Sequence, residues 1–131
     1  MVIAKVEKES TNRVDGLVRG WVRRAAITGR TDSYEGKRQN ARTSWSVPVV
    51  LRLNEDGFER ILYTMSRDVS LSGLGVVGKE RLPVMTQVEI WVGSEDRCVM
   101  GRVMHCTQTI GGYVIGIEFD LCADCGARKA G

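Results

Sequence analysis

The sequence predicts an all-β domain, a small six-stranded antiparallel β-barrel, preceded by an N-terminal amphipathic helix. From residue 46 onward, hydrophobic residues alternate with polar ones at the period of two that strands require. The strand-like runs are short and are separated by Gly-rich or polar turns. No later segment has the periodicity of a helix of useful length. Closure of the strands into a barrel would remove their exposed edges.

The helix is predicted over residues 10–27. Its apolar residues share one helical face at spacings of three and four: Val14, Leu17, Val18, Trp21, Val22 and Ala25. Gly29 supplies a stop, and residues 28–44 are predicted to form a polar linker. Two interpretations remain open, a helix packed on the domain and a basic helix lying on a membrane surface. The modest, Val-rich stripe favours packing.

Six strands follow in order. The first runs from residue 46 to 53 and the second from 58 to 65, joined by turn residues 54–57 in a hairpin. Further strands are predicted over residues 74–77, 87–92, 98–108 and 113–119, with Gly111 and Gly112 forming the last turn. The chain of 131 residues is thus divided into an N-terminal extension (1–36), a barrel domain (37–120) and a short C-terminal tail (121–131).

Cationic character is concentrated in the N-terminal third. Residues 1–42 hold ten Lys and Arg against five acids, a balance of +5, so the other 89 residues carry −2 of the net +3. Such a segment attracts an anionic partner. A nucleic-acid binder would more often be basic throughout with interleaved aromatics, so nucleic acid is not expected. No apolar run is long enough for a membrane span, and a cytoplasmic location is expected.

Two short motifs carry the functional argument. Lys37, Arg38 and Arg42 lie in a polar stretch without an acidic neighbour, and two arginines four apart can grip a phosphate or the O6/N7 edge of guanine. The stretch 67–76 holds Asp68, Ser70 and Gly73, an acceptor, a hydroxyl and a residue that permits close backbone approach. Taken singly, the first motif is typical of a solvated surface and the second of an ordinary turn.

In this order the motifs resemble the PilZ domain family, whose signature is R-x-x-x-R before the first barrel strand and [D/N]-x-S-x-x-G after the second. Here these are Arg38 to Arg42 and Asp68 to Gly73. The later segments 73–76, 82–92, 101–106 and 112–120 also look like strands of that family. The resemblance implies a receptor for the bacterial second messenger cyclic di-GMP, regulating motility or exopolysaccharide synthesis.

The resemblance also implies roles for single residues. Arg38 and Arg42 would wrap the ligand, and Asp68, Ser70 and Gly73 would hold a guanine on the barrel surface. From their positions beside these arginines, we also expect Lys37 to add a phosphate contact and Trp45, three residues after Arg42, to border the ligand. The N-terminal loop would become ordered on binding and change contacts with an unidentified downstream protein; a homodimer is compatible with the sequence. A ligand-independent adaptor of the same fold and a small basic nucleic-acid-binding barrel are the alternatives.

No catalytic constellation, cofactor or metal site is predicted. The sole CxxC, Cys122 to Cys125, lacks a second pair, and the thiols are expected to be reduced. His105, the only histidine, alternates with Val99, Gly101 and Val103, which predicts a partly buried structural role.

Overall fold

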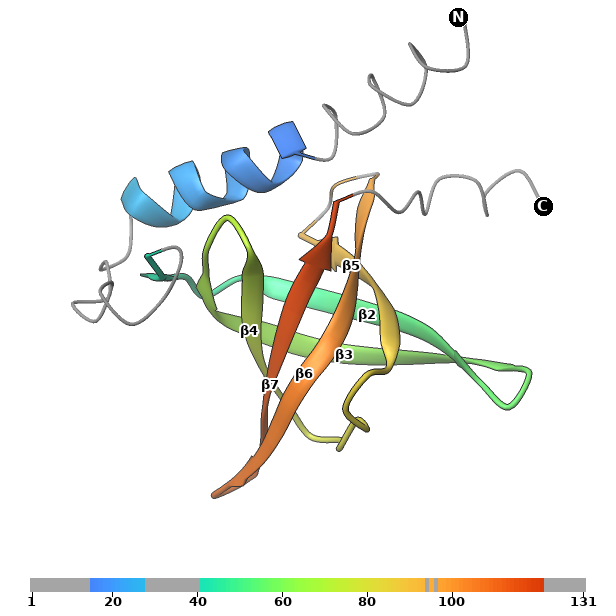
Figure 1. Cartoon of the computed structure of the whole chain (residues 1–131). Helices are drawn as coiled ribbons and strands as arrows, with labels where there is room; N and C mark the ends of the chain where they lie inside the picture. Colours follow the sequence, from blue (N-terminus) through green and yellow to red (C-terminus); the bar gives the residue numbers. More distant parts are fainter. Residues whose placement is uncertain (1–14, 28–40, 94, 96, 122–131) are drawn as a thin grey trace, which may run out of the picture.

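The computed structural model describes residues 15–27, 41–93, 95 and 97–121. Within these ranges the chain forms a helix over residues 15–27, and strands follow it (Figure 1). The strands are β1 (Thr43–Ser44), β2 (Pro48–Glu55), β3 (Phe58–Val69), β4 (Gly73–Gly78), β5 (Gln87–Val92), β6 (Cys98–Thr109) and β7 (Gly112–Asp120).

Six of these strands close into an antiparallel barrel, as predicted. The hydrogen-bonded order is β3, β2, β5, β6, β7 and β4, and β4 pairs back onto β3. The short strand β1 pairs with the end of β3, with Thr43 opposite Val69 and Ser44 opposite Asp68. β1 lies in the predicted linker, and β3 continues four residues beyond its predicted end, from Met65 to Val69. The extension of β3 contains a register shift between Ser66 and Asp68, where the period of two is interrupted.

The barrel interior is filled by the inward residues of every strand. The largest fully buried strand residues are aliphatic and come from four strands: Leu51, Leu74, Ile90 and Ile115. The β2–β3 hairpin turns on Asp56 and Gly57, both with positive φ, as expected for a two-residue turn between tightly paired strands. Most of these buried residues form one core, and Cys98 and Met100 form a second, smaller cluster against Trp91.

Two β-bulges interrupt this alternation. In β3 the register with β4 shifts between Ser66 and Asp68, and in β6 the register with β7 shifts between Val103 and His105. Each bulge inserts one residue, so the side chain that follows it turns to the opposite face. Asp68 and His105 consequently face outward, whereas alternation continued from Met65 and from Val103 would turn both inward. The prediction of a partly buried His105 is wrong for this reason, because the residue is exposed.

The helix covers one end of the barrel, which confirms the packing interpretation (Figure 1). Val18, Trp21 and Ala25 are fully buried. The indole of Trp21 lies between Trp45, at a centroid distance of 6.4 Å, and Phe119 of β7, at 5.8 Å. Within the described ranges, no helix has the length and apolar character needed to cross a bilayer.

Candidate functional site

Arg42 and Asp68 form an ion pair on the outside of the barrel. Arg42 Nη1 donates to Asp68 Oδ1 at 3.0 Å, and the two side chains are 30% and 23% exposed. Pairing of β1 with β3 sets Ser44 opposite Asp68, and Arg42 precedes Ser44 by two residues on the same face. The expectation that Arg42 lacks an acidic partner is therefore wrong, because its partner comes from 26 residues away along the chain.

This pair can exchange partners at small cost. An ion pair of this exposure contributes about 0–1 kcal/mol. A guanidinium has five N–H donors, and the contact with Asp68 uses one of them. Elsewhere on the barrel, arginines are held more fully: a hydrogen bond from Arg52 to Glu59 raises the Arg52 pKa, and one from Arg60 to Glu80 raises the Arg60 pKa. Arg60 also bonds Glu55.

Glycines form the floor beside this ion pair. Asp68 lies opposite Gly75 of β4, and a Cβ on Gly75 would come within 2.7 Å of Asp68 Oδ1. Gly75 lies opposite Gly116 of β7, where a Cβ would come within 2.1 Å of His105 Nε2. Gly73 lies nearby on β4, and a Cβ on it would come within 2.5 Å of the carbonyl oxygen of Ile117. We call the surface around Gly73, Gly75 and Gly116 the glycine face.

Ser70 builds the turn that leads into the glycine face. Its Oγ accepts hydrogen bonds from the amides of Ser72, at 3.1 Å, and Gly73, at 3.2 Å. Its own amide donates to the Gly73 carbonyl at 2.9 Å. The residue is 2% exposed. Ser70 therefore holds the β3–β4 turn, and its predicted contact with a ligand stays a prediction.

A shallow depression of about 120 Å³ lies on the glycine face. Its lining comes from segments that are far apart in the sequence and includes Arg42, Gly73, His105, Gly116 and Glu118. An arginine, flat backbone and an imidazole thus border one concave surface. Such a surface offers donors for an anion and room for a planar group.

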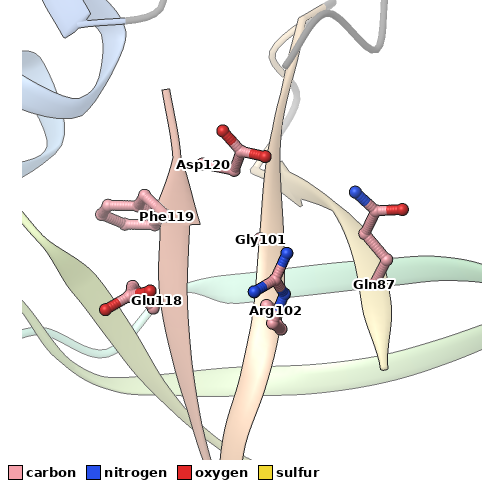
Figure 2. A pocket seen from close by; sticks show the side chains of 6 residues that line it. All are labelled: Gln87, Gly101, Arg102, Glu118, Phe119 and Asp120. Atoms are coloured by element: carbon pink, nitrogen blue, oxygen red, sulfur yellow. The ribbon is translucent and has the colours of Figure 1, made fainter. Parts of the chain in front are cut away.

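A larger hollow of about 260 Å³ lies next to it on β5, β6 and β7 (Figure 2). Figure 2 shows its side chains, among them Gln87, Arg102, Glu118 and Asp120. The lining of this hollow contains one arginine and two carboxylates, so its net charge is negative. The lining of the depression beside Arg42 holds one arginine and one carboxylate, Glu118, so that lining is less negative than this hollow, although Arg42 also pairs with Asp68.

Trp45 faces the other way. Arg42 and Ser44 point outward, whereas Thr43 and Trp45 are buried, at 4% and 6% exposure. The Trp45 ring packs on Trp21, and Arg24 lies over it at 5.7 Å. The predicted contact with a ligand stays a prediction, but the observed surroundings of Trp45 are those of the helix.

Lys37 and Arg38 lie outside the described residues. Gly75, Gly116 and His105 were not predicted as site residues; glycines inside strand-like segments were the available signal, since they often mark close backbone approach.

Cys98 is disulfide-bonded and Cys106 is free, so the expectation of reduced thiols is wrong for Cys98. Within the described ranges, no group of His, Cys, Asp and Glu is arranged to hold a metal ion.

The structure thus combines a small closed antiparallel β-barrel with a depression on its wall that is bordered by an arginine, glycines and an imidazole. The family model for the PilZ domain matches residues 36–124, about two thirds of the chain, and the chain belongs to this family of cyclic di-GMP receptors. The match contains both motifs and all of the barrel strands. PilZ domains are generally non-catalytic receptors, and some do not bind the nucleotide. No curated protein gives a significant match to the chain.

Proposed function

We propose that this protein is a non-catalytic cyclic di-GMP receptor that binds its ligand at the glycine face. The observation that carries the proposal is the Arg42–Asp68 pair beside Gly73 and Gly75, where a weakly held cation and a carboxylate border a flat floor. Arg42 would turn to a phosphate or to the O6/N7 edge of guanine, and Asp68 would accept from the N1 and N2 protons. The ligand thus replaces one ion pair by two better-matched contacts.

Lys37 and Arg38 extend this proposal along the chain. Both precede Arg42 by a few residues and would close over the ligand from the solvent side. The negative charge of two phosphates would offset the mutual repulsion of the cations in this segment and would hold the segment against the barrel. The free energy available to the switch is the difference in ligand affinity between the open and closed arrangements.

The signal would reach the helix through Trp45. Thr43 and Ser44, which form the short strand β1, are the two residues between Arg42 and Trp45. A shift of β1 when Arg42 changes partner moves the surface on which Trp21 packs. The helix would then present a different face to a downstream protein, and a process such as motility or exopolysaccharide synthesis would follow that contact.

One observation favours a second candidate, a ligand-independent adaptor. Arg42 already has an acidic partner, so the fold does not require an anion at this position. In that case the Arg42–Asp68 pair is a structural link between β1 and β3. The two candidates differ in one property, which is whether a nucleotide binds.

Isothermal titration with cyclic di-GMP separates them. GTP and cyclic di-AMP serve as nucleotide controls, and Arg42→Ala and Arg52→Ala serve as matched variants, because each removes one positive charge. Arg52 lies on β2 and pairs with Glu59 near the β2–β3 turn, and neither residue lines the depression on the glycine face. We expect selective binding that Arg42→Ala weakens ten- to hundredfold, as expected for charge-assisted bonds of about 1.5–3 kcal/mol, and that Arg52→Ala leaves unchanged.

Two other outcomes have distinct meanings. Absence of binding by the folded wild-type protein would assign the chain to the adaptor class. Tight, strongly salt-dependent binding of DNA or RNA, with cyclic di-GMP competing poorly, would support the basic nucleic-acid-binding barrel instead.

A further inference from the structure

His105 owes its position to a bulge that mirrors the one before Asp68. Val103 is fully buried opposite Ile117, and the next paired position joins His105 to Gly116. Met104 is the inserted residue between them. Cys106 then returns toward the core, where it packs against buried residues. The bulge therefore turns the imidazole of His105 outward, while Val103 before it and Cys106 after it still pack against the core.

The two outward side chains complete one row across four strands. The row runs Asp68 on β3, Gly75 on β4, Gly116 on β7 and His105 on β6, each opposite the next. The carboxylate of Asp68 occupies the space above Gly75, and the imidazole of His105 occupies the space above Gly116. The two groups thus lie over paired glycines of adjacent strands, and neighbouring strands are spaced about 4.8 Å apart.

The row sets a hydrogen-bond acceptor beside a hydrogen-bond donor. The Asp68 carboxylate accepts, and a histidine ring always carries at least one N–H. Guanine presents the complementary order on a single edge, with its N1 and N2 protons next to the O6 acceptor. Adenine presents a donor and an acceptor in the reverse order. A matched acceptor and donor would thus reward guanine and leave unpaired groups against adenine.

The remaining charges around the imidazole come from each neighbouring strand. Arg42, just before β1, borders the same depression, and its ion-pair partner Asp68 lies on β3. Glu118 on β7 lines the depression as well, and it lies opposite Arg102 on β6. Among side-chain types, histidine is the one that commonly gains a proton between pH 8 and pH 6. His105 is also the only histidine of the chain.

We propose that His105 is a specificity-determining contact that reads the O6 side of a guanine whose N1 and N2 protons bind Asp68. This inference rests on the proposed function and names a residue outside the two motifs. It makes nucleotide affinity dependent on protons, because a charged imidazole donates more strongly than a neutral one. Affinity for cyclic di-GMP increases from pH 8 to pH 6, and discrimination against cyclic di-AMP depends on the ring.

The test is titration of the full chain with cyclic di-GMP and with cyclic di-AMP at pH 6 and pH 8. His105→Ala should weaken cyclic di-GMP binding about three- to tenfold and reduce the preference over cyclic di-AMP. His105→Gln retains an N–H donor and should keep part of the affinity without its pH dependence. Thr107→Ala, an exposed change two residues along β6, is the matched control and should bind like the wild type.

A readout that needs no variant is the NMR signal of the single imidazole. Its ring resonances should shift on addition of cyclic di-GMP and should move much less with cyclic di-AMP. If the wild type binds cyclic di-GMP but His105→Ala and His105→Gln keep its affinity and pH profile, and the ring signal stays fixed, this inference is wrong and the receptor function stands. If the folded wild type binds no cyclic di-GMP at either pH, both proposals are wrong.

Discussion

The helix-covered end of the barrel and the glycine face are built on the same strand and depend on opposite properties of side chains. On β7, Phe119 fills space and packs against Trp21, whereas Gly116, three residues earlier, leaves space that His105 occupies. The first region is stabilised by large aromatic groups removed from water. The second region exists because side chains are missing from its floor.

The contrast assigns different work to the two regions. The helix-covered end contains fully buried residues such as Val18 and Trp21 and should dominate the free energy of unfolding. The glycine face holds its polar groups by exposed or half-buried contacts, which a ligand can replace without opening the core. Trp45 and Arg42 connect the regions along two residues of backbone.

The largest expected effect is on stability, at the helix-covered end. Trp21→Ala removes a fully buried indole from between Trp45 and Phe119 and should lower the free energy of unfolding by about 3–5 kcal/mol. Chemical denaturation followed by circular dichroism measures this loss. A loss below about 1 kcal/mol would show that the helix contributes little to the fold and would remove the basis for the comparison.

An intermediate effect separates two glycines of the glycine face. In Gly73→Ala the new methyl group meets the backbone oxygen of Ile117 at 2.5 Å, which cannot swing away, and we expect a loss of about 1–3 kcal/mol in stability. In Gly75→Ala the methyl group meets Asp68 Oδ1, the end of a side chain that can move. There we expect under about 1 kcal/mol in stability, but a roughly tenfold loss of cyclic di-GMP affinity as Asp68 is displaced.

Chemical denaturation of both glycine variants measures their stability, and titration with cyclic di-GMP measures their affinity. Equal effects of the two changes on stability would mean that Asp68 is as firmly held as the backbone. The glycine face would then be a structural surface like the helix-covered end.

The sequence predicted the barrel because strands with one buried face show their period directly. Val49, Leu51 and Leu53 are all buried on β2, as their alternation indicates. A sheet of these strands would have two exposed edges unless it closed into a barrel. The observed pairing of β4 with β3 closes it. Arg42 and Asp68 could be proposed as site residues through the family resemblance, which already encodes their proximity.

The faces of Asp68 and His105 could not be predicted in this way. A bulge is a property of two paired strands, and the sequence of one strand shows only the period. Alternation from Val103 turns His105 inward, and alternation from Met65 does the same to Asp68; only the partners Gly116 and Gly75 reveal the shift. The ion pair of Arg42 was missed because it depends on the pairing of a two-residue strand that lay in a predicted linker.

The smallest expected effect concerns the polar contact that orients the helix. Glu95 accepts from Trp21 Nε1 at 3.0 Å and from Arg24 Nη2 at 2.5 Å, which ties the helix to the segment between β5 and β6. Glu95→Gln keeps an acceptor for Trp21 and removes the charge that Arg24 faces, so we expect a loss of about 0.5 kcal/mol that disappears at high salt. Denaturation at low and at high ionic strength measures it. Because aromatic packing around Trp21 is unaffected, a loss comparable to that of Trp21→Ala would mean that charge rather than burial holds the helix, and a ligand acting through β1 would then have to break an ion pair to move it.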